Sequence, residues 1–434
     1  MTMWEAFGFS QNPYDHLPVS ANAAGERLLV GREEELQRLS LRIKGQNSIP
    51  TVEGDIGVGK TSIIAVSAYK LQRDFFDTGG PCYLSLERPF QLDSSETVDS
   101  FSARVYQEVL LALHGKREEL VAAGRNIGET KKLFDWLTSE QYSSVSGNLG
   151  PVGGGLSTQP STTDGFTSLG FQTKVDQLLR AMFPNQKRGG IICVIDNLEL
   201  LQKSTKAKAT MEAMRDKLLT AHGLIWVICG ARGIVRGVAS SSRLQGYLAK
   251  PMKVEPLPVN KLDGLIERRV REYELKLGSG NPPVEQDGFI HIFRVCNDNL
   301  RIALKFCSDF SEWLLDSGQA NADSTDKFQL LEVWLAEEAQ EFLEDTKLTP
   351  KPWEVFDKIV AMGGSIAPSD HETFGYETPM AMRPQIKTLE DAGLVESTID
   401  ETDQRRRTIA LTPKGWLINY SRSGYPERLG DSQA

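Results

Sequence analysis

The stretch GDIGVGKTS, residues 54–62, decides the fold of this 434-residue chain. It satisfies the pattern G-x-x-x-x-G-K-[ST], with the strand-like run IPTVE (49–53) before it and the helix-like run SIIAVSAYKLQ (62–72) after it. A strand, a glycine-rich turn and a helix in this order form a P-loop, which binds phosphate through backbone amides and the helix N-terminus. The sequence therefore predicts a nucleotide-binding α/β core.

Each residue type in this motif suits a nucleotide phosphate. The glycines let the backbone curl, Lys60 adds a positive charge, and the Thr61 hydroxyl is a ligand for Mg²⁺. ATP and Mg²⁺ are the expected ligands. The predicted nucleotide-binding residues of the loop are Gly54, Asp55, Ile56, Gly57, Val58, Gly59, Lys60, Thr61 and Ser62.

A second acidic group for the metal is expected at the end of the run IICVIDNLE (191–199). Asp196 ends an apolar strand, so its carboxylate is the predicted Mg²⁺ ligand together with Thr61. Asn197 follows, and an amide cannot take a proton from water. Glu199 is the nearest candidate base, or equally a surface acid. Nucleotide binding with slow hydrolysis is the prediction.

The rest of the chain separates into stretches of different character. CYLSL (82–86), IICVID (191–196) and LIWVICG (224–230) are near-continuous apolar runs, typical of parallel strands covered on both faces. Helical patterns follow over 261–277, 289–315 and 327–345. The predicted parts are an arm and helix (1–48), an α/β core (49–256), a helical domain (257–347), a module of short helices and polar strands (348–425) and a tail (426–434).

Composition excludes several classes. Hydrophobic residues make up 40% and charged residues 25% of the chain, which is typical of globular proteins. No run of 18 apolar residues predicts a membrane span, and no secretory signal is expected. Five cysteines without a CxxC pair indicate a reducing, cytoplasmic setting. The net charge of −9 argues against a protein that coats nucleic acid.

Five segments and the order of parts carry a family resemblance. VGREEEL (30–36), the P-loop and IDNLE (195–199) resemble the AAA+ ATPases and their relatives, the STAND signalling ATPases. SSRLQGYLAKPMKVEPLPVNKLDGLIERRV (241–270), NLRIALKFC (299–307) and the order of parts resemble the initiator clade of AAA+, of the origin-recognition-complex type. The strand ending ICGAR (228–232) departs from that pattern, because Arg232 is more similar to the strand-end arginine of STAND proteins.

The resemblance implies roles for four residues outside the P-loop. Val30 and Gly31 would flank the adenine. Arg301 would be the sensor-2 arginine of a helical lid, binding nucleotide and acting in catalysis. Arg243 would be an arginine finger offered to the ATP of a neighbouring subunit, which implies a homo-oligomer. Asn197 stands where the family has its catalytic acid.

The C-terminal module resembles the winged helix-turn-helix of MarR-type repressors, through MRPQIKTLEDAGLVE (382–396) and STIDETDQRRRTIALTPKG (397–415). The resemblance implies DNA contacts from Arg383, Gln385 and Lys387 on a helix and from Arg405, Arg406 and Arg407 on the wing. Residues 351–428 hold ten Lys and Arg against twelve Asp and Glu. This near balance leaves open a module that binds protein or packs on its own chain.

The leading hypothesis is thus an ATP-binding, slowly hydrolysing AAA+-type switch that acts on or with double-stranded DNA. A STAND-like signalling ATPase that cycles between ATP and ADP is one alternative, and an ATP-responsive transcription regulator is another. No nuclease or protease motif is evident, so an effector activity would come from a partner protein. The low-complexity segment Ser143–Gly165 is expected to be a loop, or a glycine-rich hairpin offered to a partner.

Overall fold

The computed structural model describes residues 2–55, 57–92, 96–138, 168–185, 189–198, 204–231, 234–239, 241–399 and 407–424. The chain divides into two compact units. The sheet unit comprises Val19–Gly54 and Lys60–Lys253, and the helical unit comprises Met1–Pro18, Asp55–Gly59 and Val254–Ala434.

A parallel sheet forms the core of the sheet unit. Its strands lie in the order β2-β4-β5-β1-β6, and β3 pairs with β4. Every residue of β5 is buried, as expected for a strand covered on both faces. The predicted parallel α/β core is confirmed. The strands are β1 (Thr51–Gly54), β2 (Cys82–Ser85), β3 (Phe90–Gln91), β4 (Gly189–Asp196), β5 (Leu224–Gly230) and β6 (Met252–Val254).

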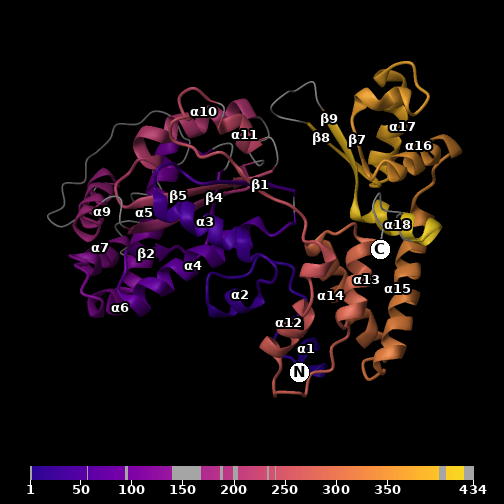
Figure 1. Ribbon diagram of the computed structural model, residues 1–434, viewed down its shortest axis with the longest axis horizontal. Coiled ribbons are helices and arrows are strands. Elements are labelled where there is room, and N and C mark those ends of the chain that lie inside the picture. Colours follow the sequence, from indigo (N-terminus) through magenta and orange to yellow (C-terminus); the bar gives the residue numbers. More distant parts are fainter. Residues whose placement is uncertain are drawn as a thin grey trace. The chain divides into compact units, whose positions relative to one another are not determined.

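Helices surround this sheet, with α10 and α11 above it and α4 below it in the view of Figure 1. Trp226 of β5 is at the centre of the core, where its ring packs against Phe90 and Phe101. The helices are α2 (Ala23–Leu28), α3 (Glu33–Gly45), α4 (Lys60–Thr78), α5 (Val98–Gly115), α6 (Arg117–Ala122), α7 (Thr130–Leu137), α9 (Ser168–Met182), α10 (Ser204–Met214), a π-helical turn (Arg215–Leu219) and α11 (Ile234–Ala239).

The N-terminal arm contributes to the core of the helical unit. Phe7, Phe9 and Tyr14 are fully buried. The Tyr14 hydroxyl donates to the carbonyl of Val284 at 2.7 Å and accepts from its amide at 2.9 Å. The arm thus supplies both apolar surface and hydrogen bonds to helices far along the chain. The helices of this bundle are α1 (Met3–Ala6), α12 (Leu265–Tyr273), α13 (Gln286–Val295), α14 (Leu300–Asp316) and α15 (Ser324–Asp345).

The helical pattern over 289–315 predicts one helix, but the structure breaks it into α13 and α14. Asn297 and Asp298 adopt φ values of 50° and 62°, a left-handed conformation that Asn and Asp tolerate better than most residues. Asn299 then caps α14, because its Oδ1 accepts from the amide of Ile302 at 3.2 Å. The backbone conformation of Asn297 and Asp298 and the cap at Asn299 therefore interrupt the helix, although the helical spacing of apolar residues continues across them.

Among its described residues, the C-terminal module has three α-helices, a short 3-10 helix (Pro368–Glu372) and a small antiparallel sheet. The sheet order is β7-β9-β8, and Pro384 lies inside α17. Phe356, Ile386 and Leu394 are among the residues of its own buried core. The elements are α16 (Pro350–Ala361), β7 (Ser365–Ile366), α17 (Pro379–Asp391), β8 (Val395–Ile399), β9 (Arg407–Leu411) and α18 (Pro413–Ser423).

The helix α18 joins this module to α13 and α15 through a polar cluster of Tyr420, Glu332 and His291. The Tyr420 hydroxyl donates to Glu332 Oε2 at 2.8 Å and lies 3.2 Å from His291 Nε2, which also contacts Glu332. Burial, then the hydrogen bond to Glu332, raises the pKa of Tyr420. The hydroxyl therefore remains a donor at neutral pH, and α18 is held to the helical bundle.

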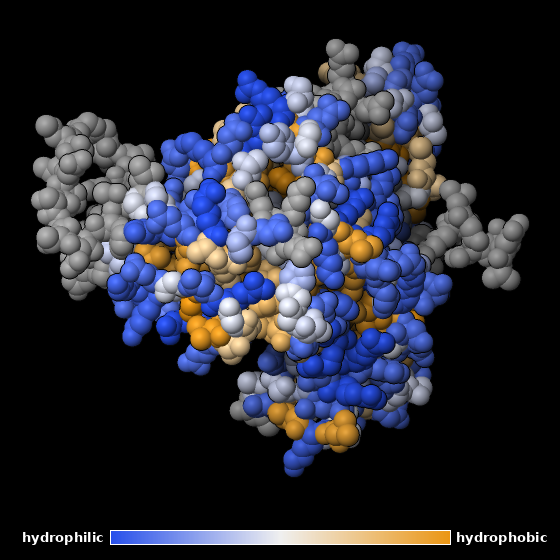
Figure 2. All heavy atoms as spheres, turned by 60° about the vertical axis from the view of Figure 1, so that its left-hand side comes forward, coloured by the Kyte–Doolittle hydropathy of each residue, from blue (hydrophilic) through white to orange (hydrophobic). Residues whose placement is uncertain are grey.

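On the face drawn in Figure 2, hydrophilic residues predominate and hydrophobic residues appear as separate patches between them. No helix within the described part of the chain combines the length and the apolar character needed to cross a lipid bilayer.

Candidate nucleotide-binding site

The loop between β1 and α4 depends on two glycines. Gly57 and Gly59 have φ values of 86° and 93°, which residues with a side chain rarely adopt. Left-handed positions of this kind are typical of backbone nests that bind anions. Of the predicted loop residues, Gly54 is the last residue of β1, Asp55 is exposed, Val58 and Ser62 are buried, and Ile56 lies outside the described residues.

The start of α4 places a buried positive charge beside this loop. Lys60 is the first residue of α4, and its side chain is 7% exposed. Its ammonium donates to the carbonyl of Gly54 at 3.0 Å. A buried ammonium at a helix N-terminus favours an anionic ligand, because both the charge and the helix dipole are positive there.

The two predicted metal ligands lie in contact. Thr61 Oγ1 donates to Asp196 Oδ2 at 2.6 Å, although the two residues are far apart in sequence. Asp196 is 4% exposed at the end of β4. Hydroxyl and carboxylate oxygens are the donors that Mg²⁺ prefers, so the residues present fit this ion.

Asn197 and Glu199 were considered for the catalytic base after Asp196, and the structure describes Asn197. The amide of Asn197 donates to Asp196 Oδ1 at 2.9 Å, and Asn197 has a φ of 54°. Glu199, the candidate base, lies outside the described residues. Arg232 and the segment Ser143–Gly165 lie outside them as well.

Val30 and Gly31 lie between α2 and α3, and both helices pack against α4. The hydrogen bond from the Val19 amide to Ser62 Oγ, at 3.2 Å, fixes the chain before α2 to the first turn of α4. Sequence reasoning missed Arg32, which is 3% exposed and pairs with Glu35 at 2.7 Å. The spacing of three residues between Arg32 and Glu35, which have opposite charges, could have indicated this ion pair from the sequence.

Within the helical unit, Arg301 lies beside the loop residue Gly57. A Cβ atom built on Gly57 would lie 3.1 Å from Arg301 Cβ and 2.6 Å from Asn299 Oδ1. The structure therefore brings the predicted sensor arginine together with the loop. It also adds Asn299, which the sequence analysis did not single out although an asparagine at the start of NLRIAL, directly before an apolar helical run, is typical of a helix cap.

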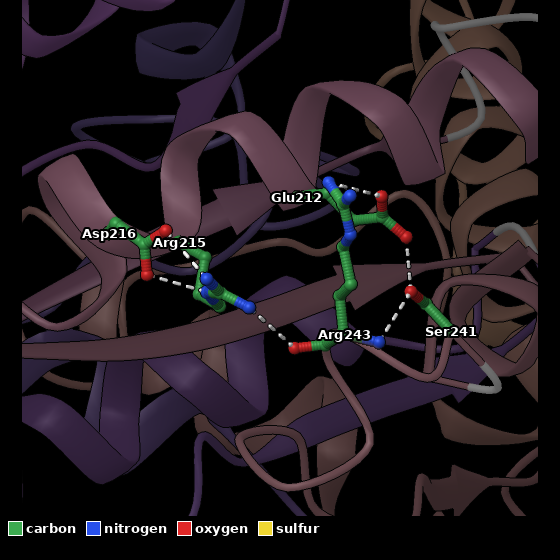
Figure 3. A network of polar contacts seen from close by, with 5 residues as sticks. All are labelled: Glu212, Arg215, Asp216, Ser241 and Arg243. Carbon is green, nitrogen blue, oxygen red and sulfur yellow. Dashed lines mark hydrogen bonds and ion pairs between the residues drawn. The ribbon is translucent and has the colours of Figure 1, made fainter.

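Arg243 follows α11 in an exposed network of polar side chains (Figure 3). Its side chain is 71% exposed, and its guanidinium lies 3.8 Å from Glu212. Ser241 also hydrogen-bonds Glu212, and the Arg243 carbonyl accepts from Arg215 at 3.3 Å. Arg215 in turn forms two hydrogen bonds with Asp216. The backbone of Arg243 is thus held in place while its charged end remains accessible.

The predicted DNA contacts are only partly described. On α17, Arg383 and Lys387 are exposed, and Gln385 is half-buried. Arg405 and Arg406 lie outside the described residues. Arg407 begins β9, and its side chain is not described.

No protein-family model and no curated protein matches the chain. Solved structures with a similar fold include the ORC1 protein of Aeropyrum pernix in complex with DNA, at 14% identity and a TM-score of 0.41 over 91% of this chain and 93% of that one. The ORC2 protein of the same organism, in ADPNP-ADP complexes, has 10% identity and a TM-score of 0.48 over 95% and 97%. The Walker-type ATPase of Pyrococcus abyssi has 13% identity and a TM-score of 0.44 over 94% and 99%.

Replacing Lys60 with alanine tests the phosphate site. The change removes the buried ammonium, so affinity for ATP should fall at least tenfold, or about 1.4 kcal/mol. Isothermal titration calorimetry measures this loss. Lys70→Ala is a matched control, because Lys70 lies on the same helix and pairs with Glu26 at the surface. Equal ATP affinity in the Lys60 variant and the wild type would contradict the assignment of this loop.

Proposed function

We propose that the chain is an ATP-binding, slowly hydrolysing switch of the AAA+ type that acts on or with double-stranded DNA. The observation that carries this proposal is the 2.6 Å contact of Thr61 with Asp196 beside the buried ammonium of Lys60. A hydroxyl, a carboxylate and a lysine at a glycine-rich helix N-terminus are the groups that a nucleoside triphosphate with its metal requires.

Each residue of the site would have a separate role in binding the nucleotide. The loop amides and Lys60 bind the phosphates and hold them in one orientation. Thr61 and Asp196 would hold Mg²⁺, which, when bound, supplies positive charge to the β- and γ-phosphate oxygens. Arg301 would add a guanidinium near the loop, since its Cβ lies close to Gly57. Val30 and Gly31 would flank the adenine.

The residues near Asp196 support slow hydrolysis. Both carboxylate oxygens of Asp196 already accept hydrogen bonds, from Thr61 and from the Asn197 amide. Asn197 cannot act as a base, and positioned general bases contribute roughly 10²- to 10⁴-fold to such reactions. Glu199 is the proposed base. A long-lived ATP-bound form suits a switch, because a switch reports to its partners whether ATP or ADP is bound.

Asp196→Ala should abolish Mg²⁺-dependent hydrolysis while ATP still binds, because the carboxylate acts through the metal. The wild-type rate itself should lie well below about 10 per second, the typical enzyme value. Phosphate release assays measure both. Asp357→Ala is the control, since Asp357 is an exposed acid paired with Arg422. Wild-type hydrolysis in the Asp196 variant, or tens of turnovers per second in the native protein, would be contrary to the proposal.

We also propose that Arg243 acts on the nucleotide of a second copy of the chain. The guanidinium is exposed, and its 3.8 Å separation from Glu212 makes a weak surface pair that a phosphate can displace. The fixed backbone, held by Ser241 and Arg215, would orient the side chain for this role.

A mixing experiment tests the shared site. Arg243→Ala protein should bind ATP normally but lose hydrolysis. Lys60→Ala protein should also lose hydrolysis, because it binds ATP poorly. Mixing the two should restore part of the activity, because some composite sites would hold both an intact loop and an intact arginine. Phosphate release in the mixture measures the rescue, with light scattering to verify association. Two variants that associate but show no rescue would exclude a site shared in this way.

DNA binding is proposed for α17. The module holds its last helix, α18, against α13 and α15, so this docking uses Tyr420 and not the exposed residues Arg383 and Lys387 of α17. The order of helices and strands in the module is that expected of a winged helix, in which this helix enters the major groove. Lysine and arginine on such a helix would neutralise phosphates and contact base edges.

Replacing Arg383 and Lys387 together with alanine should weaken binding of the full-length chain to duplex DNA. Each lost phosphate contact should reduce the slope of log affinity against log salt by about 0.9. Fluorescence anisotropy with a labelled duplex at several salt concentrations measures both quantities. Lys351→Ala, an exposed lysine on α16, is the control. DNA affinity that is absent in the native protein, or unchanged in the double variant, would favour the alternative of a protein-binding latch.

A further inference from the structure

The helix α17 begins at a well-defined residue, which determines where its side chains point. The Thr378 hydroxyl accepts from the amide of Ala381 at 3.2 Å and caps the helix, and Pro379 is its first residue. A capping threonine followed by proline is a favoured helix start, because the cap satisfies one free amide and proline has none. From this start, the period of about 3.6 residues per turn decides which residues share a face.

The two faces of α17 have different surroundings. One face is apolar and belongs to the buried core of the C-terminal module, and its residues are Met382, Ile386 and Leu389. On the other face, Met380, Arg383 and Lys387 follow one another at positions i, i+3 and i+7, and all three are exposed. The two basic residues proposed to contact DNA therefore share their face with a large apolar side chain.

Exposed apolar groups surround Arg383 in the first two turns of α17. The side chain of Met380 is 70% exposed, and Ala381 and Pro384 are exposed as well. One exposed apolar residue alone would need no explanation. Here a guanidinium lies among three of them, and the acids of α17 lie in its last turn. The matching ligand has apolar groups beside hydrogen-bond acceptors.

The major groove of DNA offers this combination. Thymine presents its C5-methyl group there, and guanine presents the acceptors N7 and O6, to which arginine binds in a bidentate manner. Residues three apart on a helix face have Cβ atoms about 5–6 Å apart. Since base pairs follow one another at about 3.4 Å, Met380 and Arg383 would reach bases one or two steps apart.

We propose that Met380 contacts the methyl group of a thymine while Arg383 contacts a nearby guanine, so that α17 selects duplexes in which these bases are neighbours. The inference rests on the proposed binding of DNA by α17, and it adds the base composition of the preferred site. Lys387, one turn further along the same face, would contact phosphate and carry no base preference.

Two synthetic duplexes that differ only in thymine methyl groups test the proposal. One has the repeat d(GTT)·d(AAC), and in the other deoxyuridine replaces every thymidine, which leaves the hydrogen-bonding groups of the bases unchanged. Fluorescence anisotropy measures the affinity of the full-length chain for each duplex. The native protein should bind the thymine duplex roughly threefold to fivefold more tightly, which is the effect of burying one methyl group.

Three substitutions assign this preference to Met380. Met380→Gln replaces the apolar end of the side chain with an amide, so this variant should bind the two duplexes equally well. Met380→Leu stays apolar and should keep the preference. Met362→Ala, which changes an exposed methionine at the C-cap of α16, is the matched control and should keep it too. None of the three alters a charge, so the slope of log affinity against log salt should stay native.

The outcomes separate this inference from the proposed function. Equal affinity of the native protein for the two duplexes would overturn the inference. A preference that survives in Met380→Gln would also overturn it, because another residue would then contact the methyl group. Binding of neither duplex, even at low salt, would overturn the proposed DNA binding itself and the inference with it. Since Met380 is exposed, its variants should melt at the native temperature, as circular dichroism would verify.

Discussion

The contact between Thr61 and Asp196 is the interaction on which the site depends. It joins the first turn of α4 to the end of β4 and therefore fixes a helix N-terminus to the carboxyl edge of the parallel sheet. Trp226, Phe90 and Phe101 pack together in the core of the same unit, in which β4 and β5 pair in parallel. Without that rigid sheet, two oxygens from distant parts of the chain would not meet at 2.6 Å.

The polar groups at this edge are arranged so that each buried charge has a partner. Lys60 donates to the Gly54 carbonyl, and Asp196 accepts from Thr61 and from the Asn197 amide. Buried charges without partners cost several kcal/mol, so these bonds lower the cost of burying Lys60 and Asp196.

Much of this arrangement could be predicted from the sequence, because its signals are local. The glycines and Lys60 of the P-loop lie within nine consecutive residues, and the apolar runs of β4 and β5 identify buried parallel strands. The left-handed backbone of Asn197 could not be predicted, since many residues follow a strand without this turn. The break at Asn297 was missed because the apolar helical period continues across it, while the polar side chains that end α13 act only locally. The cluster of His291, Glu332 and Tyr420 joins residues up to 129 positions apart, a distance at which no sequence period gives information.

The buried arm of the helical unit has a consequence for the order in which the protein is made. Tyr14 is synthesised 270 residues before its hydrogen-bond partner Val284. At roughly 5–20 residues per second, the arm waits about 15 to 50 seconds for the helices that cover it. Phe9 likewise waits for Glu274, with which it pairs, while the intervening sheet unit emerges and can fold. The bond between Tyr14 and Val284 therefore forms only after the whole sheet unit has been synthesised.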